Sequence, residues 1–264
     1  MALLHKDVTF LNFDRTYTAQ PQLLEFPYEW IDLQDVSHTN LYCDADALSR
    51  IHHRLKNRSN HGITFIGSGN YHYVSYLLLS EIQEPFSLLL FDHHTDMLSD
   101  LSSSVISCGS WATRAITSLP LLQKVIVIGA RPDLLSLLPK HWSPKVTVFP
   151  ESSFMESTDF SNCVVSAIET HAVYISIDKD VLDPAYAETN WDHGSLKLPV
   201  LLDLLRLVIS RKRIYGVDIC GEYPITPIEL FHPGCLKVLA KNEQANKQIL
   251  RLIKNHNRPS ASTG

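Results

Sequence analysis

The chain has 264 residues, of which 45% are hydrophobic and 19% charged, and its formal net charge is -5. This length suits one domain with a single large core, and the moderate charge content argues against disorder. The mild acidity argues against a dedicated nucleic-acid-binding protein, and no apolar run is long enough to span a bilayer.

Short β-branched or aromatic runs alternate with longer segments of helical periodicity. Strands are predicted at Val8–Phe13, Ile63–Ile66, Phe86–Phe91, Val125–Ile128, Val146–Phe149, Val173–Ile177 and Ile214–Val217. Helices are predicted at Asp44–Lys56, Tyr71–Glu84, Trp111–Ser118, Phe160–Thr170, Pro199–Ser210 and Asn242–Lys254. Several strands are apolar throughout, as in a parallel sheet that is buried on both faces. The pattern predicts an α/β fold, a three-layer α/β/α sandwich around a mostly parallel sheet of about eight strands.

The cysteines and the N-terminal segment bear on the cellular location of the protein. The five cysteines are odd in number and lack Cys-x-x-Cys spacing, which is typical of reduced thiols in the cytosol. The N-terminus becomes charged too soon for the core of a signal peptide. We expect a cytoplasmic protein with a single domain over residues 1–264, whose tail after about residue 255 is flexible.

Acidic residues and histidines follow several predicted strands directly. These segments are Gly67–His72, Asp92–Asp96, Asp178–Pro184 and Asp218–Pro224. Ligands of parallel sheets bind outside the carboxyl ends of the strands, so we expect these segments to converge on a site. Each segment alone also fits a turn or a helix cap, but their joint occurrence favours a metal site.

The spacing of these side chains predicts two metal ions. In extended backbone, Asp92, His94 and Asp96 point the same way, and so do Asp178 and Asp180. Burying so many carboxylates together without cations would be prohibitive. Hard oxygen ligands with a minority of imidazole favour manganese over zinc, and we expect no cysteine ligand nearby. The predicted ligands are His72, Asp92, His94, Asp96, Asp178 and Asp180.

These motifs resemble those of the arginase/agmatinase family of ureohydrolases. That family carries a glycine-rich segment ending in His, then D-A-H-x-D, then S-x-D-x-D-x-x-D-P, which here are Gly67–His72, Asp92–Asp96 and Ser176–Pro184. The resemblance implies hydrolysis of a guanidino or amidino compound at a binuclear manganese centre. It implies His72 and Asp96 on the first Mn²⁺, His94 and Asp180 on the second, and Asp92 and Asp178 as bridges. A metal-activated water would attack the guanidinium carbon, with Asp96 passing a proton to the leaving amine.

The sequence departs from the family pattern at the proton-transfer position. The family has a His-Gly pair after the D-x-H-x-D loop, and the matching residues are Cys108-Gly109. Cys108 can still donate a proton, although it is equally compatible with a small buried side chain. His93 or His193 is the alternative proton shuttle.

Substrate recognition departs from the pattern as well. The family glutamate that pairs with the guanidinium falls here on Gly221, and we expect Glu222 to replace it. Trp191, in a bulkier loop than that of arginases, is expected to wall the pocket. Arg131-Pro132-Asp133 lacks the acidic pair that would hold the α-amine of an amino acid, so free arginine is not assured as substrate.

Two other functions remain open from the sequence. One is a zinc amide hydrolase of the deacetylase type, which shares this fold and would use a single metal. The other is a non-catalytic relative that keeps the metals as structural elements. Under the leading hypothesis we expect a guanidino substrate that is either a small molecule or part of a peptide. We expect no nucleic-acid or membrane partner, and the sequence is compatible with a homo-oligomer.

Overall fold

The centre of the molecule is a parallel sheet of eight strands. The computed structural model describes residues 5–59, 61–99, 104–142, 144–156, 159–226 and 228–255. The strand order is β2-β1-β4-β10-β9-β5-β7-β8, and every neighbouring pair is parallel. The strands are β1 (Val8–Asn12), β2 (Glu29–Asp32), β4 (Ile63–Phe65), β5 (Phe86–Phe91), β7 (Leu122–Ile128), β8 (Val146–Phe149), β9 (Ala172–Asp178) and β10 (Arg213–Cys220).

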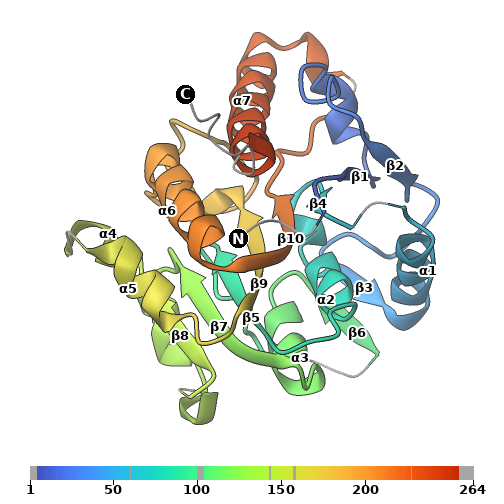
Figure 1. The fold of residues 1–264 in the computed structure, drawn as a ribbon. Coiled ribbons are helices and arrows are strands. Elements are labelled where there is room, and N and C mark those ends of the chain that lie inside the picture. Colours follow the sequence, from blue (N-terminus) through green and yellow to red (C-terminus); the bar gives the residue numbers. More distant parts are fainter. Residues whose placement is uncertain are drawn as a thin grey trace, which may run out of the picture.

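Helices cover both faces of this sheet (Figure 1). On one face lie α1 (Ala45–Lys56), α2 (Val74–Leu79) and α3 (Trp111–Ser118), and on the other α5 (Phe160–Ala167), α6 (Leu198–Arg211) and α7 (Pro233–Asn255). The side chains of successive β5 residues point to opposite faces of the sheet, because side chains alternate along a strand. Leu88 and Leu90 pack with α1 to α3, whereas Leu89 and Phe91 pack with α5 to α7. The predicted α/β/α sandwich is confirmed.

The remaining elements are short. β3 (Tyr42–Asp44) and β6 (Val105–Ser107) pair as a separate antiparallel ribbon, and α4 (Ser153–Glu156) is a single turn. The 3₁₀ helices are η1 (Thr16–Ala19), η2 (Gly69–Tyr71), η3 (Pro132–Leu137), η4 (Lys140–Trp142), η5 (Lys179–Val181) and η6 (Glu229–Phe231).

Element boundaries differ from the sequence prediction where apolar periodicity is interrupted. β10 continues to Cys220 rather than ending at Val217, because Asp218 breaks the apolar run although it is fully buried. α7 begins at Pro233 rather than Asn242, because most side chains of its first turns are exposed and carry no apolar stripe. β2 lies at the sheet edge and was not predicted.

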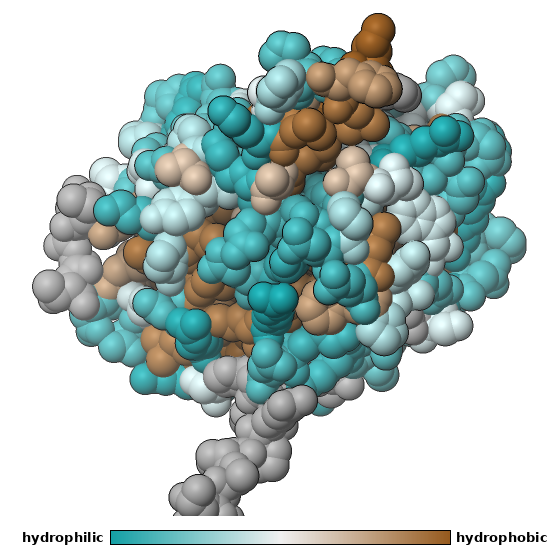
Figure 2. All heavy atoms as spheres, turned by 90° about the horizontal axis from the view of Figure 1, so that it is seen from above, coloured by the Kyte–Doolittle hydropathy of each residue, from teal (hydrophilic) through white to brown (hydrophobic). Residues whose placement is uncertain are grey.

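On the face shown in Figure 2, hydrophilic side chains predominate and apolar side chains form separate patches. Exposed large apolar residues form two main groups among the described residues. One comprises Tyr42, Leu98 and Leu137, and the other Ile228, Leu230, Phe231 and Leu236. None of the helices in the described ranges combines the length and the hydrophobicity needed to cross a membrane.

Gly62 allows the chain before β4 to lie against the segment before β1. A Cβ atom at this position would be 2.1 Å from the backbone oxygen of His5. The variant Gly62→Ala should therefore lower the free energy of unfolding by at least about 2 kcal/mol, because backbone must move to admit the methyl group. Urea denaturation measures this change.

Gly234→Ala is the matched control for that variant. Gly234 lies in the exposed first turn of α7, and its nearest neighbour is the His232 ring, at 3.1 Å from an added Cβ. Alanine is the better helix former, so this variant should be neutral or slightly more stable. Equal losses in the two variants would contradict the role given to Gly62.

Candidate metal centre

The carboxyl ends of adjacent strands bring the predicted ligands to one place. In the sheet, Cys220 of β10 is paired with Asp178 of β9, and Ile177 is paired with Phe91 of β5. Asp92 directly follows β5, so it emerges beside Asp178. His72 reaches the same edge from the end of η2. This is the position at which α/β sheets bind their ligands.

The six predicted ligands lie together as two groups that share Asp92. In the first, His72 Nδ1 is 3.0 Å from Asp96 Oδ2, 3.4 Å from Asp92 Oδ2 and 3.6 Å from Asp178 Oδ2. In the second, His94 Nδ1 is 2.8 Å from Asp180 Oδ2 and 3.5 Å from Asp92 Oδ1. Each oxygen of Asp92 thus faces a different histidine.

These residues fit divalent cations. All of them except His94 are buried, and Asp92 Oδ2 is a buried oxygen without a hydrogen-bond partner. Buried carboxylates are costly unless they are paired or bind a metal. Carboxylate oxygens and imidazole nitrogens are also the donors that divalent metals of borderline and hard character take. The arrangement can therefore hold metal ions.

A hydrogen-bonded chain behind His72 sets which ring nitrogen faces the carboxylates. The Ser176 hydroxyl donates to Asp218 Oδ1 at 2.6 Å, and its oxygen lies 2.8 Å from His72 Nε2. With its only proton given to Asp218, Ser176 accepts from His72 Nε2–H. The lone pair of the neutral ring is then at Nδ1, on the carboxylate side, as is usual for a histidine that binds metal.

Asp96 is held in a strained and well-anchored conformation. Its φ is 51°, in the left-handed region that non-glycine residues seldom adopt, and such strain gathers at functional sites. Trp111 Nε1 donates to Asp96 Oδ2 at 2.6 Å. The strain and this bond together direct the carboxylate towards His72.

The pKa values show how strongly the acidic groups depend on one another. Burial, together with the charge of Asp92, raises the pKa of Asp96 to about 7. Burial and the neighbouring Asp178 raise the pKa of Asp180 well above its usual value. Burial would lower the pKa of His94, but hydrogen bonds with Asp180 and Asp92 prevail and raise it to about 12. Without metal, the cluster holds protons that the isolated side chains would release.

A cavity of about 250 Å³ opens onto these groups. Asp96, Cys108 and Trp191 line it. Burial raises the pKa of the Cys108 thiol to about 12, so this thiol stays protonated at neutral pH.

Amide side chains fix Trp191 in the cavity wall. Its ring meets the His94 ring edge-on at 5.6 Å, and its Nε1 donates to Asn70 Oδ1 at 2.9 Å. Asn70 Oδ1 also accepts from Asn190, at 3.2 Å, and Asn70 Nδ2 donates to Asn40 Oδ1 at 2.8 Å. Loops distant in sequence are thereby tied to the indole.

The structure does not bring the two alternative histidines to the cavity. His193 Nδ1 donates to the carbonyl of Leu182 at 3.2 Å, and its Nε2 accepts from the backbone N–H of Thr189 at 3.0 Å. Both ring nitrogens are engaged in holding their own loop. His93 is buried and faces Glu151, 3.7 Å from Nδ1. Neither histidine is among the lining residues, so the role expected of His193 is not reproduced.

Glu222 also turns away from the cavity. It is fully buried, and its carboxylate pairs with Lys179 and accepts hydrogen bonds from Gln20, Asn242 and Asn246. A carboxylate so occupied is not free for a substrate cation. The position before it cannot replace it, because Gly221 has a φ of 82° and an added Cβ would lie 2.4 Å from Asp178 Oδ1.

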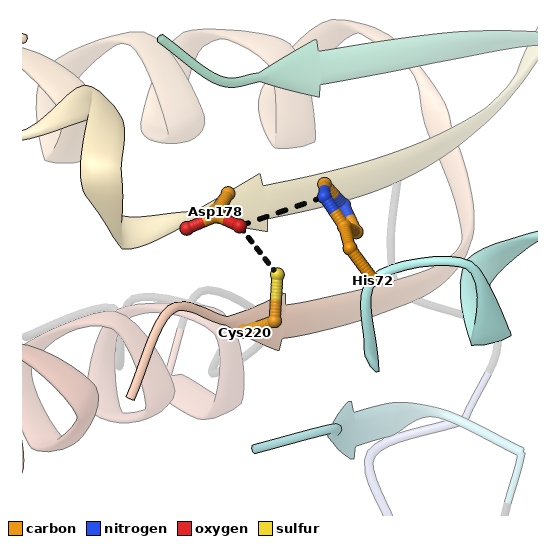
Figure 3. Close-up of side chains that lie close together, drawn as sticks. All are labelled: His72, Asp178 and Cys220. Carbon is orange, nitrogen blue, oxygen red and sulfur yellow. Dashed lines mark hydrogen bonds and ion pairs between the residues drawn. The ribbon is translucent and has the colours of Figure 1, made fainter. Parts of the chain in front are cut away.

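Cys220 is the residue that sequence reasoning missed. Its buried Sγ lies 3.1 Å from Asp178 Oδ2, and the potential ligand atoms of His72, Asp178 and Cys220 are within 4.8 Å of one another (Figure 3). We expected no cysteine ligand nearby, whereas the structure places this thiol beside two of the predicted ligands. If the last strand had been predicted to continue through Asp218, Cys220 would have been placed opposite Asp178. The strand was predicted to end at Val217 because Asp218 interrupts the apolar run.

Comparison with known proteins identifies the family. The sequence profile of the arginase family matches residues 11–227. The chain belongs to this family. An uncharacterized protein of Thermotoga maritima is 33% identical over 195 residues, which are 74% of this chain and 69% of that protein. The resemblance expected from the motifs, and with it the prediction of a hydrolytic enzyme, is confirmed.

Solved structures of this family share the fold. Proclavaminate amidino hydrolase from Streptomyces clavuligerus superposes with a TM-score of 0.65 and 19% identity, over 94% of this chain and 92% of that one. Formimidoylglutamase from Bacillus subtilis has a TM-score of 0.65 and 14% identity, over 94% of this chain and 85% of that one.

The raised pKa of Asp96 predicts how the metal-free protein responds to pH. Between the usual carboxyl pKa of 3.8 and about 7, the folded protein keeps a proton that the unfolded chain has lost. The free energy of unfolding should therefore fall as pH rises through this window, and be higher at about pH 5 than at about pH 8. Denaturation of metal-stripped protein measures it. In Asp96→Asn the difference in unfolding free energy between about pH 5 and about pH 8 should be smaller. If that difference is unchanged, Asp96 is not its cause.

Cys220 lies close enough to His72 and Asp178 to supply a sulfur ligand when a metal softer than Mn²⁺ is bound. When the protein is loaded with Co²⁺, which gives a sulfur-to-metal absorption band with thiolate ligands, we expect that band in the near ultraviolet. Cys220→Ser should abolish it. Cys108→Ser, a matched variant in the wall of the same cavity, should keep it. A protein that binds Co²⁺ without this band would show that Cys220 is not a ligand.

Proposed function

We propose that this arginase-family protein is an amidinohydrolase with two Mn²⁺ ions. It would hydrolyse a C–N bond of a guanidino or amidino compound and release urea or an analogue together with an amine. The observation that carries the proposal is Asp92, whose two oxygens face two separate groups of ligands at the floor of one cavity. The relatives named as an amidino hydrolase and a formimidoylglutamase support the reaction class.

The ligands would divide between the ions as their contacts suggest. His72 and Asp96 would hold one ion, His94 and Asp180 the other, with Asp92 and Asp178 shared. Bound divalent ions lower the pKa of water, so that hydroxide becomes available at neutral pH. Donors with mainly hard oxygen character favour Mn²⁺, whereas a sulfur ligand would favour a softer metal. Cys220 therefore makes the identity of the metal the first quantity to measure.

The other side chains would bind substrate and move protons. Asp96 lines the cavity and is anchored by Trp111 through one oxygen, so the carboxylate is positioned to accept a proton and pass it to the leaving amine. The Cys108 thiol, protonated at neutral pH, would be a hydrogen-bond donor towards the cavity. Trp191 would cover the planar reacting group. We further propose a cytoplasmic location, which the free cysteines support.

A single-zinc amide hydrolase is the second candidate. Asp92, His94 and Asp180 form a group of two carboxylates and one imidazole, which suits one zinc. The complete second group around His72 favours the binuclear proposal, since a single-metal enzyme has no use for it.

Metal content and urea release test the proposal together. After loading with Mn²⁺ and desalting, we expect two ions per chain and urea release from a guanidino compound. Asp178→Asn should bind less metal and lose activity by at least about 100-fold, because a shared ligand is removed. Asp203→Asn, at an exposed carboxylate on α6, is the matched control and should change neither quantity.

Other results would point elsewhere. One zinc per chain with amide hydrolysis would establish the second candidate. A chain that binds no metal under any loading condition would overturn both.

A further inference from the structure

The part of the cavity beyond the ligands is apolar. Most of its wall there consists of aliphatic and aromatic side chains. The charged residues among the described lining residues are the predicted metal ligands themselves. The apolar members are Leu41, Tyr42, Met97, Leu98, Leu134, Leu137, Leu138 and Trp191.

Several of these side chains are exposed although they are large and apolar. Tyr42 is 54% exposed, Leu98 56% and Leu137 64%. The core does not account for them, because they remain in contact with solvent. They come from three separate segments, yet they gather around one cavity, and an exposed apolar group of this kind marks a binding surface.

The charged residues that are close in sequence to Leu134 and Trp191 pair with each other and do not line the cavity. The Arg131 guanidinium bonds to Asp133 at 2.7 Å and to Asp192 at 2.9 Å. None of these three residues is among the described residues that line the cavity, so none of them faces a substrate tail inside it. Glu222 is buried against Lys179, and Gly221 offers no side chain. A charged substrate tail would find no partner among the described wall residues.

We infer that the reacting guanidino or amidino group of the substrate is attached to a short, uncharged alkyl or aryl group. The inference rests on the proposed function, and it names the substrate class. The cavity of about 250 Å³ lies below the roughly 300–1,000 Å³ of pockets for drug-sized ligands, which suits a small tail. Each methylene buried against the leucines should strengthen binding about fourfold, whereas an unpaired charge would weaken it.

Three guanidines of matched length test this inference: butylguanidine with an apolar tail, agmatine with an ammonium group and 4-guanidinobutyrate with a carboxylate. For the metal-loaded full-length protein, kcat/KM for butylguanidine should exceed that for either charged compound by at least about tenfold. Calorimetric binding of the same compounds provides an order of affinity that does not depend on turnover. Equal or better use of a charged compound would overturn the inference.

The two readouts separate the two proposals. If butylguanidine binds most tightly but none of the compounds releases urea, the proposed function is wrong, whereas the inference of an apolar substrate tail is supported. If urea is released fastest from agmatine or 4-guanidinobutyrate, the proposed function stands and the apolar tail fails. If no compound binds, both fail.

A charge placed in the wall gives a second test. Leu137→Asp should raise the ratio of kcat/KM for agmatine to that for butylguanidine by at least about tenfold, because the new carboxylate meets the ammonium group. Leu137 is exposed, so folding should tolerate the change. Leu236→Asp, at an exposed leucine of α7, is the matched control and should leave the ratio unchanged. Identical ratios in the two variants would contradict a substrate tail against Leu137.

Discussion

The electrostatic cost of crowding carboxylates into a buried space governs this site. Four aspartates and two histidines meet at the carboxyl ends of β5 and β9, largely out of contact with water. Such a cluster is tolerable only if protons or cations neutralise it. The raised pKa values of Asp96 and Asp180 show that bound protons neutralise part of the cluster when no metal is present. Metal ions are the alternative source of positive charge. The sheet order makes the crowding unavoidable, since β5, β9 and β10 are neighbours.

A buried ion pair between Lys179 and Glu222 keeps both side chains away from the acidic cluster. Lys179 lies between the ligands Asp178 and Asp180 at the start of the 3₁₀ helix η5, and its side chain points to a buried place away from the acidic cluster. There it pairs with Glu222, which is also held by Gln20 near η1 and by Asn246 of α7. The pair removes a lysine from the acidic cluster and at the same time joins β9 to the last helix. Breaking a buried pair by removing one partner commonly costs about 3–5 kcal/mol.

Much of the fold and the ligand set could be predicted from the sequence because both depend on local patterns. The apolar runs mark the strands, and alternate spacing after β5 identifies Asp92, His94 and Asp96. What could not be predicted depends on register and backbone conformation. Cys220 meets Asp178 only because the two strands pair in that register. Glu222 turns inward after a residue whose φ is positive, a change of direction that spacing cannot reveal.

The hydrogen bonds that hold Trp191 come from groups without a titratable proton. Asn40, Asn70 and Asn190 link their carboxamides to one another and to the indole, so no member of this chain changes charge between acidic and alkaline solution. The floor of the cavity gains and loses protons as its acidic groups titrate, whereas the asparagine side chains that hold Trp191 keep the same hydrogen bonds throughout. The position of Trp191 is thereby independent of the ionisation of the acidic groups beside it.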